Sequence, residues 1–193
     1  MTKTTIGLLR HGQTDWNIDF RLQGTADIPL NETGIAQATA AAHLIKRSDW
    51  EVLLTSPLSR AVDTAKIVAN IVGFENIEVE ELLLERAFGE AEGMLHEQWH
   101  EKYGNHTPAP GSESLEELAE RGWLLLERLV LLHPGKRILA VSHGAMIRKL
   151  ISLISNGTLP PAGDRFGNLA LNIVSFDEKE WVVEHYDPKT LGA

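Results

Sequence analysis

Two kinds of hydrophobic pattern alternate along the chain. Some segments are continuous apolar runs, which are typical of strands buried on both faces, and others repeat apolar positions every three to four residues, as amphipathic helices do. The continuous runs predict strands over 5–9, 51–56, 76–83 and 137–144, and a closing hairpin over 170–176 and 181–186. The helical pattern predicts helices over 33–47, 58–73, 114–135 and 145–155.

This alternation of strands and helices determines the expected fold class. Parallel strands need long crossover connections, and the predicted helices between the strands supply them. We therefore expect an α/β fold, a three-layer α/β/α sandwich around a mostly parallel central sheet. The 193 residues contain no internal repeat, low-complexity tract or linker, so we expect a single domain over 1–193.

Capping residues and helix breakers mark where the predicted helices end. Thr33 is the expected N-cap of the first long helix, and Ser114 and Glu117 have the spacing of a capping box before the longest one. Glycine, proline and asparagine are concentrated in 104–113 and 155–168, so we expect these two segments to be loops.

Composition and charge limit the partners and the compartment. The net charge is −9 and no basic run occurs, so we expect no nucleic-acid partner and no membrane partner. The absence of cysteine excludes disulfides and cysteine-ligated zinc and leaves no need for an oxidising compartment. The N-terminus lacks the apolar stretch of a signal peptide, and no apolar run is long enough to span a bilayer, so the expected location is the cytoplasm.

Two of the predicted strands end in histidine followed by glycine. The first strand runs into Arg10 and His11, and a later strand runs into His143. A third strand leads into a helix that carries Arg60 in its first turn. Because the carboxyl ends of parallel strands meet at one edge of a sheet, where ligands bind in open α/β folds, we expect these side chains to converge there.

The chemistry that these residue types suggest is phosphoryl transfer. A guanidinium group offers paired donors that match phosphate oxygens, and a helix N-terminus adds backbone donors. A neutral imidazole is a nucleophile at neutral pH without an activating base. Taken alone, each short motif also has a purely structural interpretation, since a histidine at the end of a strand needs no catalytic role.

Six segments, in order over most of the chain, have the residue patterns of one known family. They are LLRHGQTDWN (8–17), LQGTADIPLNETGIAQA (22–38), SPLSRAVDTA (56–65), LLERAFGEAEG (83–93), PGSES (110–114) and VSHG (141–144). Together they resemble the histidine phosphatase superfamily, which has the phosphoglycerate mutase-like fold. An ordered set of six is far more specific than any one of its members.

The resemblance implies a role for each of five residues. His11 would be the nucleophile that forms a phosphohistidine. Arg10, Arg60 and His143 would hold the phosphoryl oxygens and stabilise the transition state. Glu85 would be the general acid for the leaving alcohol and then the base for water. From the residues alone, Glu85 is one of several glutamates in an acidic stretch, and its place in the matched segment is what selects it.

The resemblance also implies further substrate contacts and a small cap. Asn17 would contact the phosphate, and Gln23 and Gly24 would lie along the pocket. A cap or loop region is expected around 86–113. No metal ligands and no cofactor are implied.

Two departures from the mutases of this family favour a phosphatase. Those mutases have a longer, more basic insert after the acid segment, whereas only 17 residues separate Gly93 from Gly111 here, and Lys102 is the only lysine or arginine among them. Phe88 stands where those mutases have tyrosine. A phosphoglycerate mutase-type transferase is the first alternative. A catalytically silent phosphate-binding domain is the second, and the presence of all five core residues argues against it.

The stretch HEQWHEKYGNH (96–106) contains a His-Glu-x-x-His motif that resembles a zinc protease site. The three-histidine form of that site has glycine at the position of Tyr103, and the polar flanks do not suit a buried metal helix. We therefore expect a solvated amphipathic helix with Leu95 and Trp99 packed inward. In a further alternative, Met94, Trp99 or Tyr103 contacts the leaving group.

The sequence thus predicts a metal-independent phosphomonoester hydrolase that acts on small phosphorylated metabolites through a phosphohistidine. Contacts to the leaving group are expected from 86–110 and 155–168. The identity of the phosphomonoester and the oligomeric state stay open, a homodimer included.

Overall fold

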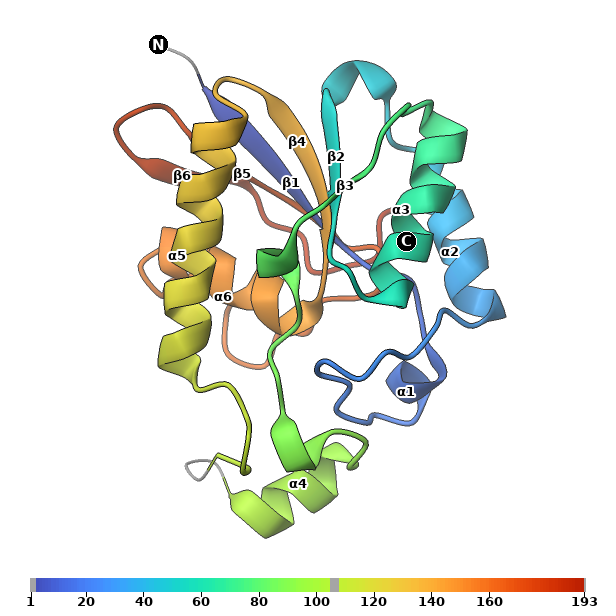
Figure 1. Ribbon diagram of the computed structural model, residues 1–193, viewed down its shortest axis with the longest axis vertical. Coiled ribbons are helices and arrows are strands. Elements are labelled where there is room, and N and C mark those ends of the chain that lie inside the picture. The colour runs from blue at the N-terminus through green and yellow to red at the C-terminus, as the bar shows by residue number, and fades with distance from the viewer. Residues whose placement is uncertain (1–2, 105–107, 193) are drawn as a thin grey trace.

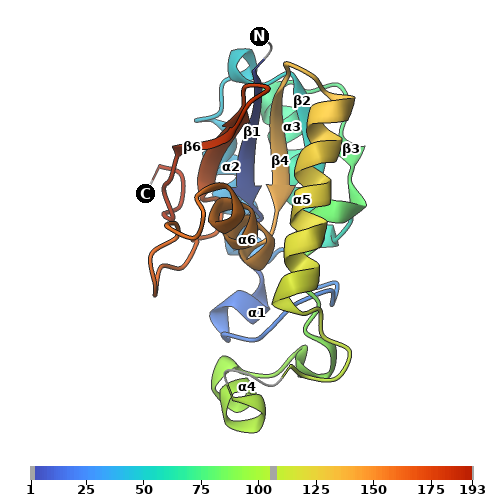
Figure 2. The same ribbon diagram turned by 90° about the vertical axis from the view of Figure 1, so that its left-hand side faces the viewer.

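A computed structural model of the chain describes residues 3–104 and 108–192. A six-stranded sheet lies between two pairs of helices, α2 with α3 on one face and α5 with α6 on the other (Figures 1 and 2). The expected α/β/α sandwich is therefore confirmed. Its helices are α1 (Asp15–Ile18), α2 (Glu32–Ala42), α3 (Ser59–Val72), α4 (His96–Tyr103), α5 (Leu115–Leu132) and α6 (Gly144–Ile154), with short 3₁₀ helices at Arg47–Asp49, Glu81–Leu83 and Gly89–Ala91.

The sheet is parallel except at one edge. Its strand order is β3-β2-β4-β1-β5-β6, in which β3, β2, β4 and β1 are mutually parallel and β5 and β6 form the predicted antiparallel hairpin. The strands are β1 (Thr4–Arg10), β2 (Val52–Thr55), β3 (Glu78–Val79), β4 (Arg137–Ser142), β5 (Leu171–Phe176) and β6 (Trp181–His185).

Both faces of the central strands are buried, which explains their continuous apolar runs. In β4, Ile138 and Ala140 face the α5/α6 layer, and Leu139 and Val141 face the α2/α3 layer. All four side chains are inaccessible to solvent. Because successive side chains of a strand point to opposite faces, such a run can form only where helices cover both sides.

Three sequence predictions about element boundaries are wrong. The first long helix, expected to end at residue 47, ends at Ala42. The cap of α2 is Asn31 instead of Thr33, because the Asn31 side chain accepts a hydrogen bond of 2.8 Å from the Gly34 amide. The strand predicted over 76–83 shrinks to the two residues of β3. The chain turns into a 3₁₀ helix immediately after it, where the side chain of Glu80 accepts a hydrogen bond from the Leu82 amide.

The segments 86–104 and 108–113, for which a cap was expected, lie at one end of the sandwich and contain α4 (Figure 1). A small separate core holds them together, built on Leu22, Ala91 and Ala109. A bridge between Arg21 and Leu95 ties the cap to the segment after α1. No helix in the described ranges is long and apolar enough to cross a membrane.

Candidate active site

The strand register brings the two histidines together. Arg10, the last residue of β1, pairs with Ser142, the last residue of β4, so His11 and His143 follow neighbouring strands at the same height. Their ring centroids are 5.1 Å apart. The expected convergence of these side chains at the carboxyl edge of the sheet is therefore observed.

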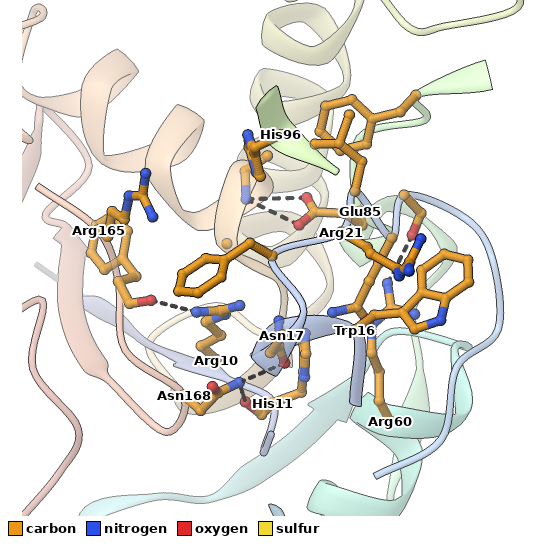
Figure 3. Close-up of a pocket in the computed structure, with 18 of the residues that line it drawn as sticks. Arg10, His11, Trp16, Asn17, Arg21, Arg60, Glu85, His96, Arg165 and Asn168 are labelled. Carbon is orange, nitrogen blue, oxygen red and sulfur yellow. Dashed lines mark hydrogen bonds between the residues drawn. The ribbon is translucent and has the colours of Figure 1, made fainter. Parts of the chain in front are cut away.

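A cavity of about 370 Å³ opens at this edge (Figure 3). It is lined by seven of the eight residues that the sequence predicts for the site: Arg10, His11, Asn17, Gln23, Gly24, Arg60 and Glu85. The eighth, His143, is completely buried behind this lining. Their proposed roles stay predictions, but the structure brings the whole set to one place.

The hydrogen bonds of His11 define its tautomer. The Nδ1 atom lies 2.7 Å from the carbonyl oxygen of Gly12, and because a carbonyl only accepts, Nδ1 must carry the proton. The other ring nitrogen, Nε2, then holds the lone pair. The Gly12 amide in turn donates to Thr64 of α3 at 3.0 Å, which fixes the loop that carries the ring.

The surroundings of His11 keep the ring neutral. Burial lowers the pKa of His11 well below its usual value of 6.5, and the positive charges of Arg60 and Arg10 lower it further. The hydrogen bond to Gly12 acts in the opposite direction and is the smallest of these effects. A neutral ring with a free lone pair is the form in which imidazole attacks phosphorus.

This charge state gives a testable expectation. In a ¹⁵N NMR titration of the free protein, His11 should still be the neutral Nδ1–H form at pH 6.5. Because the pKa is lowered, the ring should take up its second proton only as the pH falls below that value. The spectrum of His11→Ala assigns the signal. A midpoint at or above pH 6.5 would contradict the expected effect of burial and of the two arginine charges on the pKa of His11.

Arg60 is the second residue of α3 and is completely buried. Its Nη1 and Nη2 atoms donate to the carbonyl oxygens of Ala26 and Gly24, both at 2.8 Å, and its Nε donates to Nδ1 of His143 at 3.3 Å. Since guanidinium has five N–H donors, one on each Nη remains for a ligand. Burial lowers the pKa of Arg60 to about 10, so the group stays charged at neutral pH.

His143 supports Arg60 from behind. Its Nδ1 accepts from Arg60, so its Nε2 carries the proton and donates to the hydroxyl of Ser56 at 2.7 Å. Burial, and after it the charge of Arg60, lowers the pKa of His143 well below its usual value. The side chain of His143 therefore positions Arg60, and a direct contact between His143 and a phosphoryl oxygen stays a prediction.

Arg10 and Asn17 present further donors to the cavity. One Nη of Arg10 donates to the Phe166 carbonyl, whereas its Nε has no partner among the described residues. The side-chain oxygen of Asn17 accepts from Thr14 and from Asn168 (Figure 3). The amide nitrogen of Asn17 is thus the end that is left for a ligand.

Glu85 lies at the N-terminus of α6. Its carboxylate accepts hydrogen bonds from the backbone amides of Arg86 at 2.9 Å and of Ala145 and Met146 at 3.1 Å. Gly144 lies between Arg10 and Glu85: a Cβ there would stand 3.6 Å from Arg10 Nε and 4.0 Å from Glu85 Oε2, which is ordinary van der Waals contact. The Glu85 carboxylate and the Arg10 guanidinium therefore flank one glycine.

The cavity mouth contains residues that the sequence analysis did not single out. They include Trp16, Phe20, Arg21, Arg148, Arg165 and Phe166, and His96, which had been considered only as a zinc ligand, lies with them. His96, Arg165 and Phe166 lie in the two segments from which leaving-group contacts were expected. Apart from His96 and Trp16, which lie within quoted motifs that gave them no role in the cavity, these residues had no sequence signal, because neither a motif nor a periodicity selects them.

The His-Glu-x-x-His stretch forms α4, as expected for a solvated helix, and His96 and His100 are exposed. Among residues 3–104 and 108–192, no three side chains are grouped to hold a metal ion, and His106 lies outside these ranges. Met94, Trp99 and Tyr103 pack into the cap core instead of the cavity. Phe88 and His96 face the cavity in their place.

Comparison with known proteins identifies the family. A family model for the histidine phosphatase superfamily (branch 1) matches residues 6–188. The chain therefore belongs to the histidine phosphatase superfamily, as its motifs indicated.

Individual relatives extend over nearly the whole chain. A Bacillus subtilis protein named uncharacterized phosphatase PhoE is 37% identical over 95% of this chain and 94% of its own. The metal-independent phosphoserine phosphatase of Arabidopsis thaliana is 32% identical over 95% of this chain and 81% of its own. Proteins named probable phosphoglycerate mutase GpmB also match, at 34% identity over 96% of this chain and 91% of the Photorhabdus laumondii protein.

A solved structure confirms the phosphoglycerate mutase-like fold. The mycobacterial glucosyl-3-phosphoglycerate phosphatase, solved as a complex with VO3, superposes with a TM-score of 0.83 at 29% identity. The match covers 94% of this chain and 98% of that one.

Proposed function

We propose that the protein hydrolyses small phosphomonoesters through a phosphohistidine at His11, without a metal ion. One observation carries the proposal. A single cavity holds the free Nε2 of His11, two arginines with uncommitted donors and the carboxyl group of Glu85. Phosphatases named among the relatives of this chain support the same class of reaction.

The reaction proceeds in two displacements. In the first, His11 Nε2 forms a bond to phosphorus as the bond to the leaving oxygen breaks, and Glu85 gives that oxygen a proton. In the second, water attacks phosphorus, Glu85 takes a proton from the water, and the N–P bond breaks. Inorganic phosphate and an alcohol are the products, and the enzyme returns to its starting state.

Arg10 and Arg60 supply the positive charge that this reaction requires. Their free N–H groups bind the equatorial phosphoryl oxygens, where charge accumulates in the transition state. The hydrogen bonds of Arg60 to Gly24 and Ala26 hold its guanidinium before the substrate arrives. The charge of these side chains takes the part that a metal ion plays in other phosphatases.

The cavity mouth favours a substrate with a second anionic group. Five arginines and one carboxylate, Glu85, line the cavity, although the chain as a whole has a net charge of −9. Two of these arginines serve the phosphate. Arg165 is exposed, has no hydrogen bond or ion pair among the described residues, and lies 6.0 Å from the ring of Phe20. It is free to pair with a carboxylate or a second phosphate on the leaving group.

The mutase alternative has weaker support in the geometry. A mutase must keep water from the phosphohistidine and hold a second phosphate within a closed site. Lys102, the only lysine or arginine between Gly93 and Gly111, is exposed on α4 and is not part of the cavity wall. Phe88, which lacks the hydroxyl of the mutases' tyrosine, does line the cavity.

Turnover of a matched substrate pair in excess EDTA tests the proposal. 3-Phosphoglycerate and glycerol 3-phosphate differ only in a carboxylate against a hydroxymethyl group. We expect both to be hydrolysed, and we expect 3-phosphoglycerate, which carries the carboxylate, to have the higher kcat/KM. Arg165→Met should reduce this preference by about 5- to 10-fold, the worth of one charge-assisted hydrogen bond in a partly exposed site.

Lys66→Met is the control, because it removes the same charge from an exposed position of α3 outside the cavity. Turnover that stops in EDTA would overturn the metal-independent mechanism. A preference that is unchanged in Arg165→Met would reject Arg165 as the anion-binding residue while leaving the hydrolase intact. Transfer of phosphate to a second acceptor alcohol in preference to water would favour the mutase.

A further inference from the structure

Arg121, a residue of α5 outside the cavity, controls the position of Glu85. We propose that it is a positioning residue for the acid–base step, an inference that rests on the role proposed for Glu85. Glu85 lies in an irregular segment, because the preceding 3₁₀ helix ends at Leu83 and no strand or helix includes residues 84–87. Its backbone must therefore be held by contacts from elsewhere.

Arg121 supplies these contacts with every donor of its guanidinium group. Nη1 donates to the carbonyl oxygens of Leu82 and Leu84, both at 2.8 Å, and Nη2 donates to the carbonyl oxygen of Glu85 at 3.3 Å. Nε and Nη2 also form a two-point pair with the Glu113 carboxylate, at 2.8 Å each. All five N–H groups are thus used on the segment that carries Glu85 and on its neighbour.

Glu113 holds the chain on the C-terminal side of Glu85, so that Arg121 and Glu113 together form a clamp on the segment that carries Glu85. Its amide donates to the carbonyl of Ala87 at 2.9 Å, and its carbonyl accepts from Nε of Arg86 at 2.9 Å. The residues before Glu85 are therefore held by Arg121 directly, and those after it through Glu113. The side chains of this pair are only 18% and 16% exposed, so solvent screens their interaction little.

The contacts of Arg121 and Glu113 matter because α6 binds only the carboxylate of Glu85 and not its main chain. Backbone amides at the start of α6 bind its oxygens, while the clamp fixes the main chain from which the side chain extends. A general acid acts only within hydrogen-bond reach of the leaving oxygen, and displacement by about 1 Å can reduce the rate on the order of 100-fold. Arg121 thus affects catalysis without touching the substrate.

A second arginine on the same helix provides a matched control. Arg128, two turns after Arg121 on α5, pairs with Glu80 at 2.8 Å and binds the same stretch of chain further from Glu85. Its side chain is 54% exposed and lies outside the cavity. Arg128→Met removes an arginine–glutamate pair from the same helix without releasing the Glu85 segment.

The leaving group distinguishes positioning from general destabilisation. p-Nitrophenolate departs without a proton, whereas the alkoxide of glycerol 3-phosphate needs one from Glu85. We compare kcat/KM, which reports the steps up to departure of the leaving group, because both substrates share the later attack of water. We expect Arg121→Met to lower kcat/KM for glycerol 3-phosphate by about 10- to 100-fold and kcat/KM for p-nitrophenyl phosphate by less than about 3-fold. Arg128→Met should change neither. Equal loss with both substrates would overturn the inference.

A double-variant cycle tests whether Arg121 acts through Glu85. Once Glu85→Gln has removed the acid, Arg121→Met should cause no further loss with glycerol 3-phosphate. Multiplicative losses would reject the inference. If Glu85→Gln does not itself slow the alkyl substrate more than the aryl one, the proposed role of Glu85 fails as well. If Arg121→Met does not fold, Glu113→Gln opens the same clamp with a smaller change and should show the same substrate dependence.

Discussion

Replacement of His11 by alanine should reduce the turnover of p-nitrophenyl phosphate on the order of 10⁴-fold or more, which is the scale on which a lost nucleophile acts. The cavity would keep Arg10, Arg60 and Glu85, so substrate would still bind, but the N–P bond could not form. A colorimetric assay in excess EDTA measures the effect. The same variant should bind orthovanadate or phosphate with its arginines and show no covalent phosphoenzyme after acid-free quenching.

His43→Ala is the matched control, because His43 is an exposed histidine at the end of α2, far along the chain from every cavity residue. It should keep full activity. Activity that survives in His11→Ala but disappears with EDTA would contradict the phosphohistidine. It would instead favour a metal site on the His-Glu-x-x-His helix, whose first histidine, His96, faces the cavity mouth.

The convergence of Arg10, His11, His143 and Arg60 was predictable because strand topology determines it. Arg10 and His11 end one apolar run and His143 ends another, and parallel pairing of the two runs leaves no other place for these side chains. Arg60 follows from the same logic, since the helix after β2 must start at that edge. In each case, a pattern that spans several residues determines where one side chain lies.

The cavity mouth was not predictable to the same degree. Phe20 adopts a positive φ of 55°, a conformation that no periodicity in the sequence indicates for a phenylalanine. Arg165 lies in the loop between α6 and β5, and its place depends on how that loop crosses the cavity. The composition of 155–168 predicted a loop but contains no information about its path.

The contacts of Arg121 could not be predicted from the sequence for a different reason. On the predicted helix it occupies an ordinary polar position, and its partners lie 8 residues away at Glu113 and 36 to 39 residues away in the 82–85 segment. Only the packing of α5 against the 3₁₀ helix before Glu85 brings these groups together. A side chain whose role depends on tertiary contacts with backbone carbonyls has no signature in its own sequence neighbourhood.

Arg60→Lys should be almost as damaging as Arg60→Met, with kcat lowered by about 100- to 1,000-fold in each, as for loss of a transition-state donor. Lysine keeps the positive charge in water, but it has three donors on one atom. It cannot reach Gly24, Ala26 and a phosphoryl oxygen in the planar arrangement that arginine uses.

Burial adds a second penalty for lysine. Burial lowers the pKa of Arg60 to about 10, which still leaves that group charged. A lysine at the same place starts from a pKa that is lower by about 2 or more, so the same burial would leave part of it neutral near pH 7. The activity of Arg60→Lys relative to the wild type should therefore rise as the pH is lowered, whereas that of Arg60→Met should not.

Kinetics of both variants across a pH series, with inhibition by inorganic phosphate as a measure of binding, would show this difference. A lysine variant with near wild-type kcat would mean that charge alone, and not the guanidinium geometry, stabilises the transition state.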